Sequence, residues 1–184
     1  MTKRILAIAL VLCAVLCVVS CTQPFDPSAK SEGVMTYAEY DAAELEAAVV
    51  IEAFVQAKQA WYEPAATTSI YAQDADGAYF MYRIACSAED YAKLTPGTKI
   101  KVTGHKAEWA GEVELTDATV TVVDGDKWVA EAADITSSLA TDPADKMNQK
   151  VKFTDMTVVA SNEDGAAFLY NWDGSGAEGD DVYF

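Results

Sequence analysis

Alternating apolar and polar residues predict a chain that is dominated by β-strands from residue 49 onward. Residues 49–56 (VVIEAFVQ) carry aliphatic side chains at every odd position, which is the period of two expected of a half-buried strand. Residues 74–77 (DADG) end in Asp-Gly, a strong signal for a hairpin turn. The further predicted strands cover residues 68–73, 79–84 and 99–104 and a last pair at 111–115 and 119–123.

Two short helices are predicted around these strands. Thr36 and Glu39 have the spacing of a capping box, and good helix formers follow, so we expect a helix over residues 37–46. Ser87 is placed to cap a second short helix that ends near Leu94.

Three strands, a short helix and two more strands are the element order of an OB-fold, a five-stranded Greek-key barrel. Residues 71–80 (YAQDADGAYF) resemble the hairpin "aliphatic-x-Gln-Asp-x-x-Gly-x-aromatic" of bacterial exported OB-fold domains, and residues 96–104 (PGTKIKVTG) resemble their fourth strand. The resemblance implies a mainly β OB-fold domain, which we delimit at residues 36–127. It implies no activity, because a fold alone does not determine one.

The C-terminal part of the chain resembles the beginning of a second copy. Residues 148–158 parallel the first strand, and residues 165–171 and 181–184 suit a second strand and the start of a third. We therefore expect a linker over residues 128–146 and a partial second OB-like unit over residues 147–184. An incomplete barrel leaves unpaired strand edges, so either the sequence is a fragment or these strands pair elsewhere.

The N-terminal residues predict export. Lys3 and Arg4 precede an apolar run over residues 5–19, which suits a secretory signal peptide over residues 1–20. The run is shorter than the roughly 20 apolar residues that a spanning helix needs. The alternatives are an uncleaved membrane helix and an ordinary signal peptide followed by a chance cysteine.

Residues 18–21 (VVSC) resemble the lipobox of bacterial lipoproteins. The resemblance implies that Cys21 becomes the mature N-terminus and carries diacylglycerol and a fatty acid such as palmitate. Residues 21–35 are rich in proline, serine and glycine and predict a lipidated tether. The protein is then anchored to the cell membrane and faces away from the cytoplasm. Thr22 after the lipid cysteine favours the outer membrane or cell surface.

Cysteine usage agrees with this picture. Cys13 and Cys17 leave with the signal peptide and Cys21 carries lipid, so Cys86 alone remains and the mature chain forms no internal disulfide. We predict that Cys86 is a small buried apolar residue.

The charge disfavours nucleic acid as a partner. Loss of Lys3 and Arg4 leaves 11 basic and 29 acidic residues, a net charge of −18, and such a field repels phosphate backbones. The local exception to this negative charge is a basic stretch that comprises residues 99–102 (KIKV), His105 and Lys106. The alternation in residues 99–102 predicts the solvated face of a half-buried strand.

No catalytic apparatus is visible in the sequence. His105 is the only histidine, which excludes paired histidine ligands, and the common serine-hydrolase, phosphate-loop and zinc-protease motifs are absent. We therefore predict a protein that is not an enzyme and has no cofactor. His105 is expected in an exposed loop.

Calcium is a candidate ligand because acidic turns are frequent. Asp74 begins a run like an EF-hand loop, but Ala85 stands where the bidentate glutamate is required. A weak calcium candidate is the glycine-rich loop that contains Asp173, Asp180 and Asp181. The alternative is a solvated loop between strands.

Aromatic side chains are the best indication of a ligand site. The OB-fold pattern places Phe80 and Tyr82 on the outer face of their strand, and strands two and three of OB-folds commonly bind oligonucleotides or oligosaccharides. The candidate ligand-binding residues are Tyr71, Phe80, Tyr82, Trp61 and Trp109. Flat rings on an acidic protein suit neutral sugars or peptides. Alternatively, these rings pack under the N-terminal helix or against the second unit, and a one-residue register error would exchange the two faces.

The sequence thus predicts a membrane-anchored lipoprotein of the cell envelope with a non-catalytic OB-fold module that binds a glycan or peptide. The alternative is a structural or assembly component that pairs through tandem β-barrels. Nucleic-acid binding is a third, less favoured hypothesis. An exposed aromatic cluster favours the first, an oligomer in solution the second, and binding that weakens steeply with salt the third.

Overall fold

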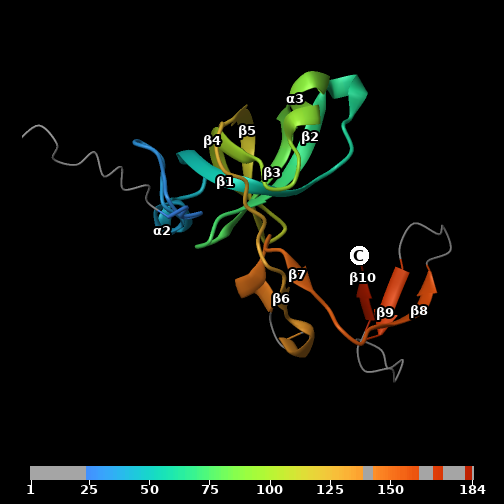
Figure 1. The fold of residues 1–184 in the computed structure, drawn as a ribbon. Coiled ribbons are helices and arrows are strands. Elements are labelled where there is room, and N and C mark those ends of the chain that lie inside the picture. Colours follow the sequence, from blue (N-terminus) through green and yellow to red (C-terminus); the bar gives the residue numbers. More distant parts are fainter. Residues whose placement is uncertain (1–23, 139–142, 162–167, 172–180, 184) are drawn as a thin grey trace, which may run out of the picture.

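Five strands close into a barrel in the computed structural model, which describes residues 24–138, 143–161, 168–171 and 181–183. The barrel strands are β1 (Ala48–Lys58), β2 (Thr67–Gln73), β3 (Ala78–Ala85), β4 (Lys99–Trp109) and β5 (Glu112–Val122). Their order around the barrel is β1-β2-β3-β5-β4, with β4 returning to β1 (Figure 1). Neighbouring strands are antiparallel except β3 and β5, which are parallel. This is the five-stranded OB-fold, and it confirms the predicted mainly β Greek-key barrel.

The core forms because each strand turns its apolar face inward. Tyr79 and Met81 of β3 are fully buried in the core cluster together with Leu94, which follows helix α3 (Ala88–Lys93). The same cluster includes Ile51, Val55, Ile70, Ile100, Val102 and Leu115 from the other strands. Cys86 is buried and free, as predicted.

Helix α2 (Tyr37–Ala42) has the predicted capping box at Thr36 but ends four residues before the predicted end at 46. Its last carbonyl groups are satisfied from a distant strand. The buried Lys106 ammonium of β4 donates to the carbonyl oxygens of Tyr40, Asp41 and Ala43, at 3.2, 2.7 and 2.9 Å. A cation at a helix C-terminus is favourable because it meets the negative end of the helix dipole.

The predicted strand pair at 111–115 and 119–123 is one strand, β5, with a bulge. Asp117 has φ 48°, and the register against β4 shifts between Thr103 and His105. Gly104 lies at this shift, where an added Cβ would come within 2.9 Å of both the Ala118 Cβ and the Thr116 carbonyl oxygen. The expectation that His105 lies in a loop is wrong: it is exposed, but it lies within β4.

The predicted solvated lysine face is also only partly present. Lys99 is half-buried, and its ammonium lies 2.9 Å from the carboxylate of Glu52, which is itself buried. Lys101 is half-buried and Lys106 is buried. Strand alternation does not reveal these pairings, because the partners come from β1 and α2.

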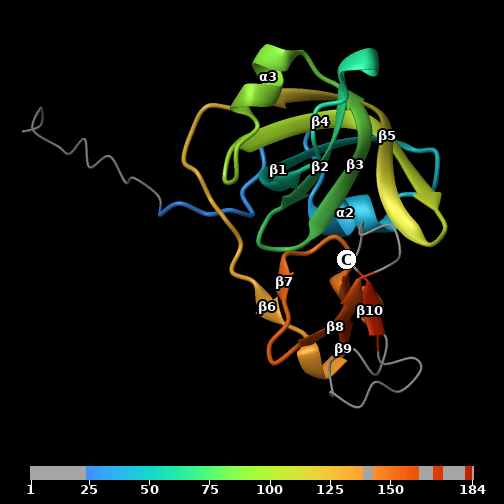
Figure 2. The same ribbon diagram turned by 90° about the vertical axis from the view of Figure 1, so that its right-hand side faces the viewer.

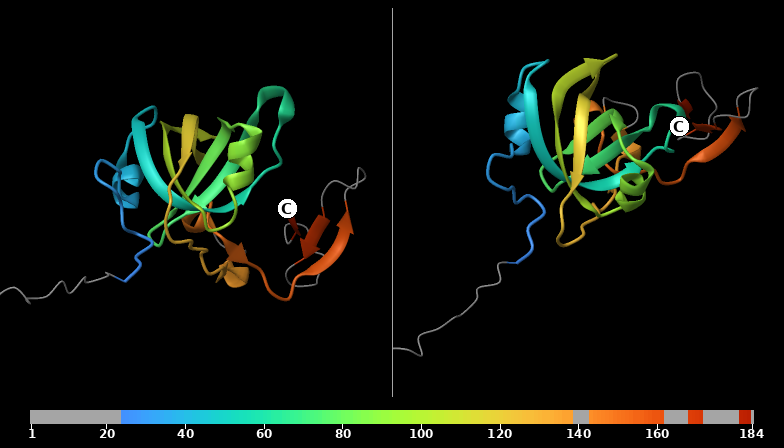
Figure 3. Two further views of the ribbon diagram at one scale, coloured as in Figure 1. Left: turned by 45° about the horizontal axis from the view of Figure 1, so that its top comes forward. Right: turned by 90° about the horizontal axis from the view of Figure 1, so that it is seen from above.

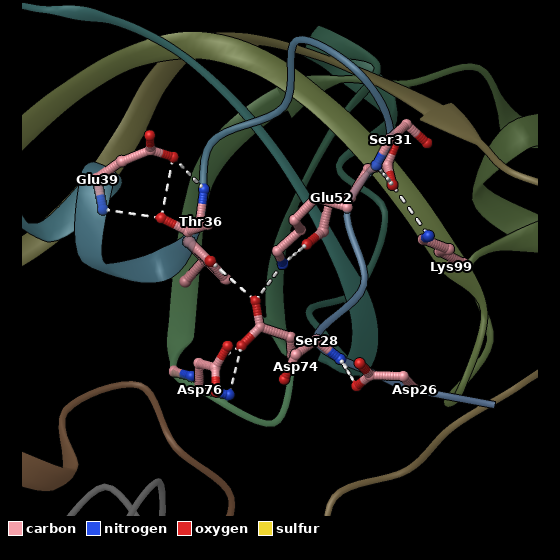
Figure 4. Close-up of polar contacts among 12 residues, drawn as sticks. Asp26, Ser28, Ser31, Thr36, Glu39, Glu52, Asp74, Asp76 and Lys99 are labelled. Atoms are coloured by element: carbon pink, nitrogen blue, oxygen red, sulfur yellow. Dashed lines mark hydrogen bonds and ion pairs between the residues drawn. The ribbon is translucent and has the colours of Figure 1, made fainter. Parts of the chain in front are cut away.

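Part of the predicted tether lies against the barrel. The Met35 amide donates to the Val50 carbonyl at 2.9 Å, and the Lys30 ammonium donates to the Glu52 carbonyl at 2.7 Å and pairs with buried Asp74. Figure 4 shows the Ser31 amide of the same segment bonded to the Glu52 carboxylate. Residues 24–35 are therefore not a free tether over their whole length.

The chain after the barrel adds short elements. They are β6 (Ala133–Asp134), β7 (Val151–Lys152), β8 (Thr157–Ser161), β9 (Phe168–Asn171) and β10 (Asp181–Tyr183), with 3-10 turns at Thr136–Ser138 and Pro143–Lys146. A further 3-10 turn, Glu63–Ala65, lies within the barrel between β1 and β2. Strands β6 and β7 pair in parallel, and β8, β9 and β10 form an antiparallel sheet beside the barrel (Figures 1 and 3). The second OB-like unit stays a prediction. In the part of the chain that the structure describes, no helix has the length and apolarity to cross a membrane.

Candidate functional site

The outer face of β2 and β3 carries the predicted row of aromatic rings. Tyr71 and Phe80 are cross-strand partners, and their rings stack with centroids 4.6 Å apart and an interplanar angle of 23°. Tyr82 follows with its ring centroid 6.2 Å from that of Phe80. Since Tyr79 and Met81 point into the core, Phe80 and Tyr82 lie on the outer face.

The row is not one exposed platform. Phe80 is 4% exposed, Tyr71 is half-buried and Tyr82 is 42% exposed. Burial raises the pKa of the Tyr71 hydroxyl, with a smaller contribution from Glu112. Only the Tyr82 end of the row offers a ring to a ligand.

The burial of Phe80 follows from a segment of the chain almost 70 residues away. The Met147 sulfur accepts a hydrogen bond from the Val113 amide at 3.4 Å, and the Asn148 side chain donates to the Val113 carbonyl at 3.1 Å. The Lys150 amide donates to the Gln73 side chain at 3.0 Å. The segment thus bridges β5 and β2, the two strands that flank β3 in the barrel, and it lies at the end of the barrel nearest β7 (Figure 2). For Phe80, the packing alternative therefore holds.

The same segment also borders a hollow next to β1 and β2. It has a volume of about 440 Å³, and its walls include Tyr71, Gln56 and the side chains of residues 148–150. The Gln56 side chain is already engaged, because its Oε1 accepts from the Ala130 amide at 2.9 Å and its Nε2 donates to the Phe54 carbonyl at 3.0 Å. This hollow therefore has few polar groups free for a ligand.

An open groove on the barrel, about 580 Å³, lies between β3 and β5. These parallel strands pair at Met81 and Leu115, and beyond that pair they border the groove. We call it the β3–β5 groove; the residues that line it include Thr67, Tyr82, Arg83, Thr116, Asp117 and Thr119.

Two left-handed residues shape the β3–β5 groove. Arg83 (φ 46°) lies two residues beyond Met81, and Asp117 (φ 48°) lies two residues beyond Leu115. The Arg83 amide donates to the Ser69 hydroxyl at 3.2 Å, which replaces a lost ladder bond. Bulges redirect side chains and are frequent beside functional sites, where such unfavourable backbone conformations are retained.

The groove combines one aromatic ring with separated hydrogen-bonding groups. The Arg83 guanidinium lies over the Tyr82 ring, with Cζ 5.4 Å from the centroid, and both side chains are exposed. Asp117 faces them from β5 as an exposed acceptor, and threonine hydroxyls from three positions add donors and acceptors. A ligand here would meet the flat apolar face of Tyr82 and several separated polar groups. The charges of Arg83 and Asp117 cancel, so the groove has no net charge.

The two predicted tryptophans occupy other places. Trp61 is half-buried in the β1–β2 connection and donates from Nε1 to the Cys86 carbonyl at 2.9 Å, so it anchors this loop. Trp109 is 73% exposed at the end of β4 and does not line the β3–β5 groove. The structure therefore does not bring these two residues together with Tyr82. Arg83 and Asp117 are the polar groups that sequence reasoning missed, and an exposed non-glycine bulge leaves no clear sequence signal.

Some predicted sites lie outside the described residues. These are the lipidation site Cys21 and the calcium candidates Asp173 and Asp180, whereas Asp181 is described only as the first residue of β10. Among the residues that are described, no three His, Cys, Asp or Glu side chains gather in a way that could hold a metal ion.

Comparisons with known proteins give only distant structural likenesses. No family model and no curated protein matches the chain. Among solved structures, the chain is similar to an Entamoeba histolytica asparaginyl-tRNA synthetase in complex with asparaginyl-adenylate, with 13% identity, a TM-score of 0.38 and coverage of 60% of this chain. The match spans 29% of the synthetase chain. A murine DNA-binding protein bound to double-stranded DNA is similar at 16% identity and a TM-score of 0.37, with 66% of this chain and 68% of that chain covered. The strand order and closure of the barrel define the OB-fold independently of these likenesses.

Proposed function

We propose that the protein is a lipid-anchored lipoprotein of the bacterial envelope whose OB-fold barrel binds a neutral glycan in the β3–β5 groove. The observation that carries the proposal is the joint placement of the exposed Tyr82 ring, Arg83 and Asp117 around one open groove. Ligand sites typically pair an apolar or aromatic surface with a few converging polar groups.

The groups that line this groove match the apolar face and the hydroxyl groups of a neutral sugar. The C–H face of a pyranose ring can lie on Tyr82, whose orientation is restrained by the Arg83 cation at its face. Adjacent sugar hydroxyls both donate and accept, which matches an acceptor-only carboxylate at Asp117 and a donor-only guanidinium at Arg83. No catalytic role is proposed for these residues.

Other ligand classes fit less well. The mature charge of −18 repels a polyphosphate backbone. An extended peptide often binds by adding a strand to a sheet edge, whereas the ends of β3 and β5 that border the groove are interrupted by the left-handed residues Arg83 and Asp117, and such bulges disfavour strand addition.

The glycan proposal is tested by titrating the protein with neutral oligosaccharides of bacterial envelopes in a calorimeter. Tyr82→Ala removes the stacking face and should weaken binding at least about tenfold, which corresponds to about 1.4 kcal/mol. Asp117→Asn, whose side chain also tolerates the left-handed backbone, should weaken binding through loss of the charged acceptor.

Tyr62→Ala is the matched control, because Tyr62 is an exposed tyrosine outside the groove. It should leave affinity unchanged. Unchanged urea midpoints would show that all three variants are folded. Equal affinities of Tyr82→Ala and the unmodified protein would refute the site, and an absence of saccharide binding would refute the ligand class.

The anchor is tested separately by mass analysis of protein purified from membranes. The proposal predicts a chain that begins at Cys21 and carries acyl chains, and it predicts that Cys21→Ser releases the protein from the membrane. Labelling of intact cells with a reagent that does not cross membranes tests the outward orientation. A native chain that retains residues 1–20 without fatty acid would contradict the proposed anchor.

A further inference from the structure

We propose that an aromatic patch at one end of the barrel rests in the phospholipid headgroup layer and so sets the orientation of the barrel on the membrane. The patch, which we call the basal patch, consists of Phe25, Phe54, Trp128 and Val129. This inference rests on the lipid anchor of the proposed function, and its partner is the zwitterionic lipid surface around that anchor.

The basal patch is a contiguous set of rings from three parts of the chain. The Phe25 ring meets the Phe54 ring edge-on, with centroids 5.9 Å apart and an interplanar angle of 82°. The Trp128 ring meets Phe54 from another side, at 5.7 Å and 66°. The Trp128 amide donates to the Gly97 carbonyl at 3.1 Å, which holds this residue against the start of β4. The patch is therefore built by defined contacts on the body of the barrel.

The outer members of the patch expose large apolar side chains next to one another. Phe25 and Val129 are each 46% exposed, whereas Phe54, whose ring contacts those of Phe25 and Trp128, is buried. Trp128 is half-buried, with its ring against Phe54. Exposed aromatic surface of this kind is typical of interaction sites, and tryptophan is enriched at the level of lipid headgroups.

The position of the anchor selects a membrane as the occupant. Phe25 is the fourth residue after Cys21, so the chain between them spans at most about 14 Å when fully extended. The headgroup layer on each side of a bilayer is about 5–8 Å thick. A lipid on Cys21 thus keeps Phe25 close to the headgroups, whereas a protein partner would have to displace them.

The charges around the patch favour a zwitterionic surface. Lys127 is exposed beside Trp128, and Asp26, Asp124 and Asp126 are exposed nearby in sequence. The Lys99 ammonium lies 6.0 Å from the Phe54 ring centroid but is already paired with Glu52. The exposed Lys127 among three carboxylates gives no net attraction to anionic lipid, so the apolar rings must supply the contact.

A second tryptophan at the opposite end of the barrel provides an internal reference for the orientation. Trp128 contacts the residues just before β4, and Trp109 lies at the far end of this strand, ten residues from Lys99. At about 3.3 Å per residue, the two ends of β4 are roughly 30 Å apart. Trp109 should therefore point away from the membrane when Trp128 touches it.

The test supplies the anchor chemically. The chain from residue 21 to 184, which contains every described residue, is prepared with Cys86→Ser and coupled through the Cys21 thiol to a maleimide lipid in phosphatidylcholine vesicles. A fraction of the phosphatidylcholine carries a nitroxide on its headgroup, which quenches tryptophan fluorescence at that depth. The quenched fluorescence is compared among the coupled protein, its Trp128→Phe variant and its Trp109→Phe variant.

The inference predicts that Trp128→Phe loses most of the quenched fluorescence and that Trp109→Phe retains it. Phe25→Ser should lower the quenching without touching a tryptophan, and circular dichroism checks that each variant is folded. Quenching that is absent, that survives Trp128→Phe or that is lost with Trp109→Phe would overturn the inference. Because the anchor is supplied here, these results are independent of whether the cell lipidates Cys21, which mass analysis decides.

Discussion

Replacement of Asp74 by asparagine should destabilise the barrel strongly, because Asp74 is the centre of a buried polar network (Figure 4). Its carboxylate is fully buried. It accepts hydrogen bonds from the Asp76 and Gly77 amides, both at 2.8 Å, from the Tyr79 hydroxyl at 2.9 Å and from the Lys30 ammonium. An asparagine side chain at this position would keep the shape but lose the charge and place an N–H₂ donor toward one or more of these donors.

The expected loss of stability in Asp74→Asn follows from the Lys30 ammonium, which remains without its ion-pair partner. The Lys30 side chain is only 8% exposed, so Asp74→Asn leaves a nearly buried ammonium without its counter-charge. Removing one partner of a buried ion pair costs about 3–5 kcal/mol. Lys30→Met should cost less, about 2 kcal/mol, because the Asp74 carboxylate keeps three other donors.

Urea unfolding of the two single variants and the double variant provides the assay. The double variant should be less destabilised than the sum of the singles by about 1–3 kcal/mol, because it contains neither buried charge. Equal losses of stability in Lys30→Met and Asp74→Asn, or strictly additive effects in the double variant, would show that the two side chains do not form a coupled buried ion pair.

Two further predictions concern β4 and β5. Gly104→Ala should cost about 1–3 kcal/mol, because its Cβ would lie 2.9 Å from the Ala118 Cβ, and Ala118→Gly should recover part of the loss in a thermal melt; no loss would mean that the bulge adjusts freely. Burial, and then the nearby Glu112, raises the pKa of Glu114 above that of the unfolded chain, so this group favours the folded state below the ordinary glutamate pKa and that contribution is lost as the pH rises through the raised value. Glu114→Gln should therefore increase the free energy of unfolding at pH 7 and not below about pH 4, and an equal gain at both pH values would contradict the assignment.

Local signals in the sequence determined the elements of the barrel. The period of two defined the strands, the Thr36–Glu39 and Ser87 caps defined where both helices begin, and Asp-Gly defined the β2–β3 hairpin. The same period separated Phe80 and Tyr82 from Tyr79 and Met81, and the OB-fold pattern placed the first pair on the outer face. These features depend on neighbours within a few residues, so a single chain suffices to predict them.

The tertiary structure alone decided which outward side chains are accessible. Phe80 and Lys106 both follow the local alternation, yet Phe80 is buried on the strand whose two neighbours are bridged by residues 147–150, and Lys106 caps α2. The β3–β5 groove likewise joins Tyr82 and Arg83 to Asp117, more than thirty residues away, through bulges in two parallel strands. Burial and the convergence of polar groups depend on contacts between distant segments, and a local pattern of hydrophobic and polar residues carries no information about which segment crosses which face.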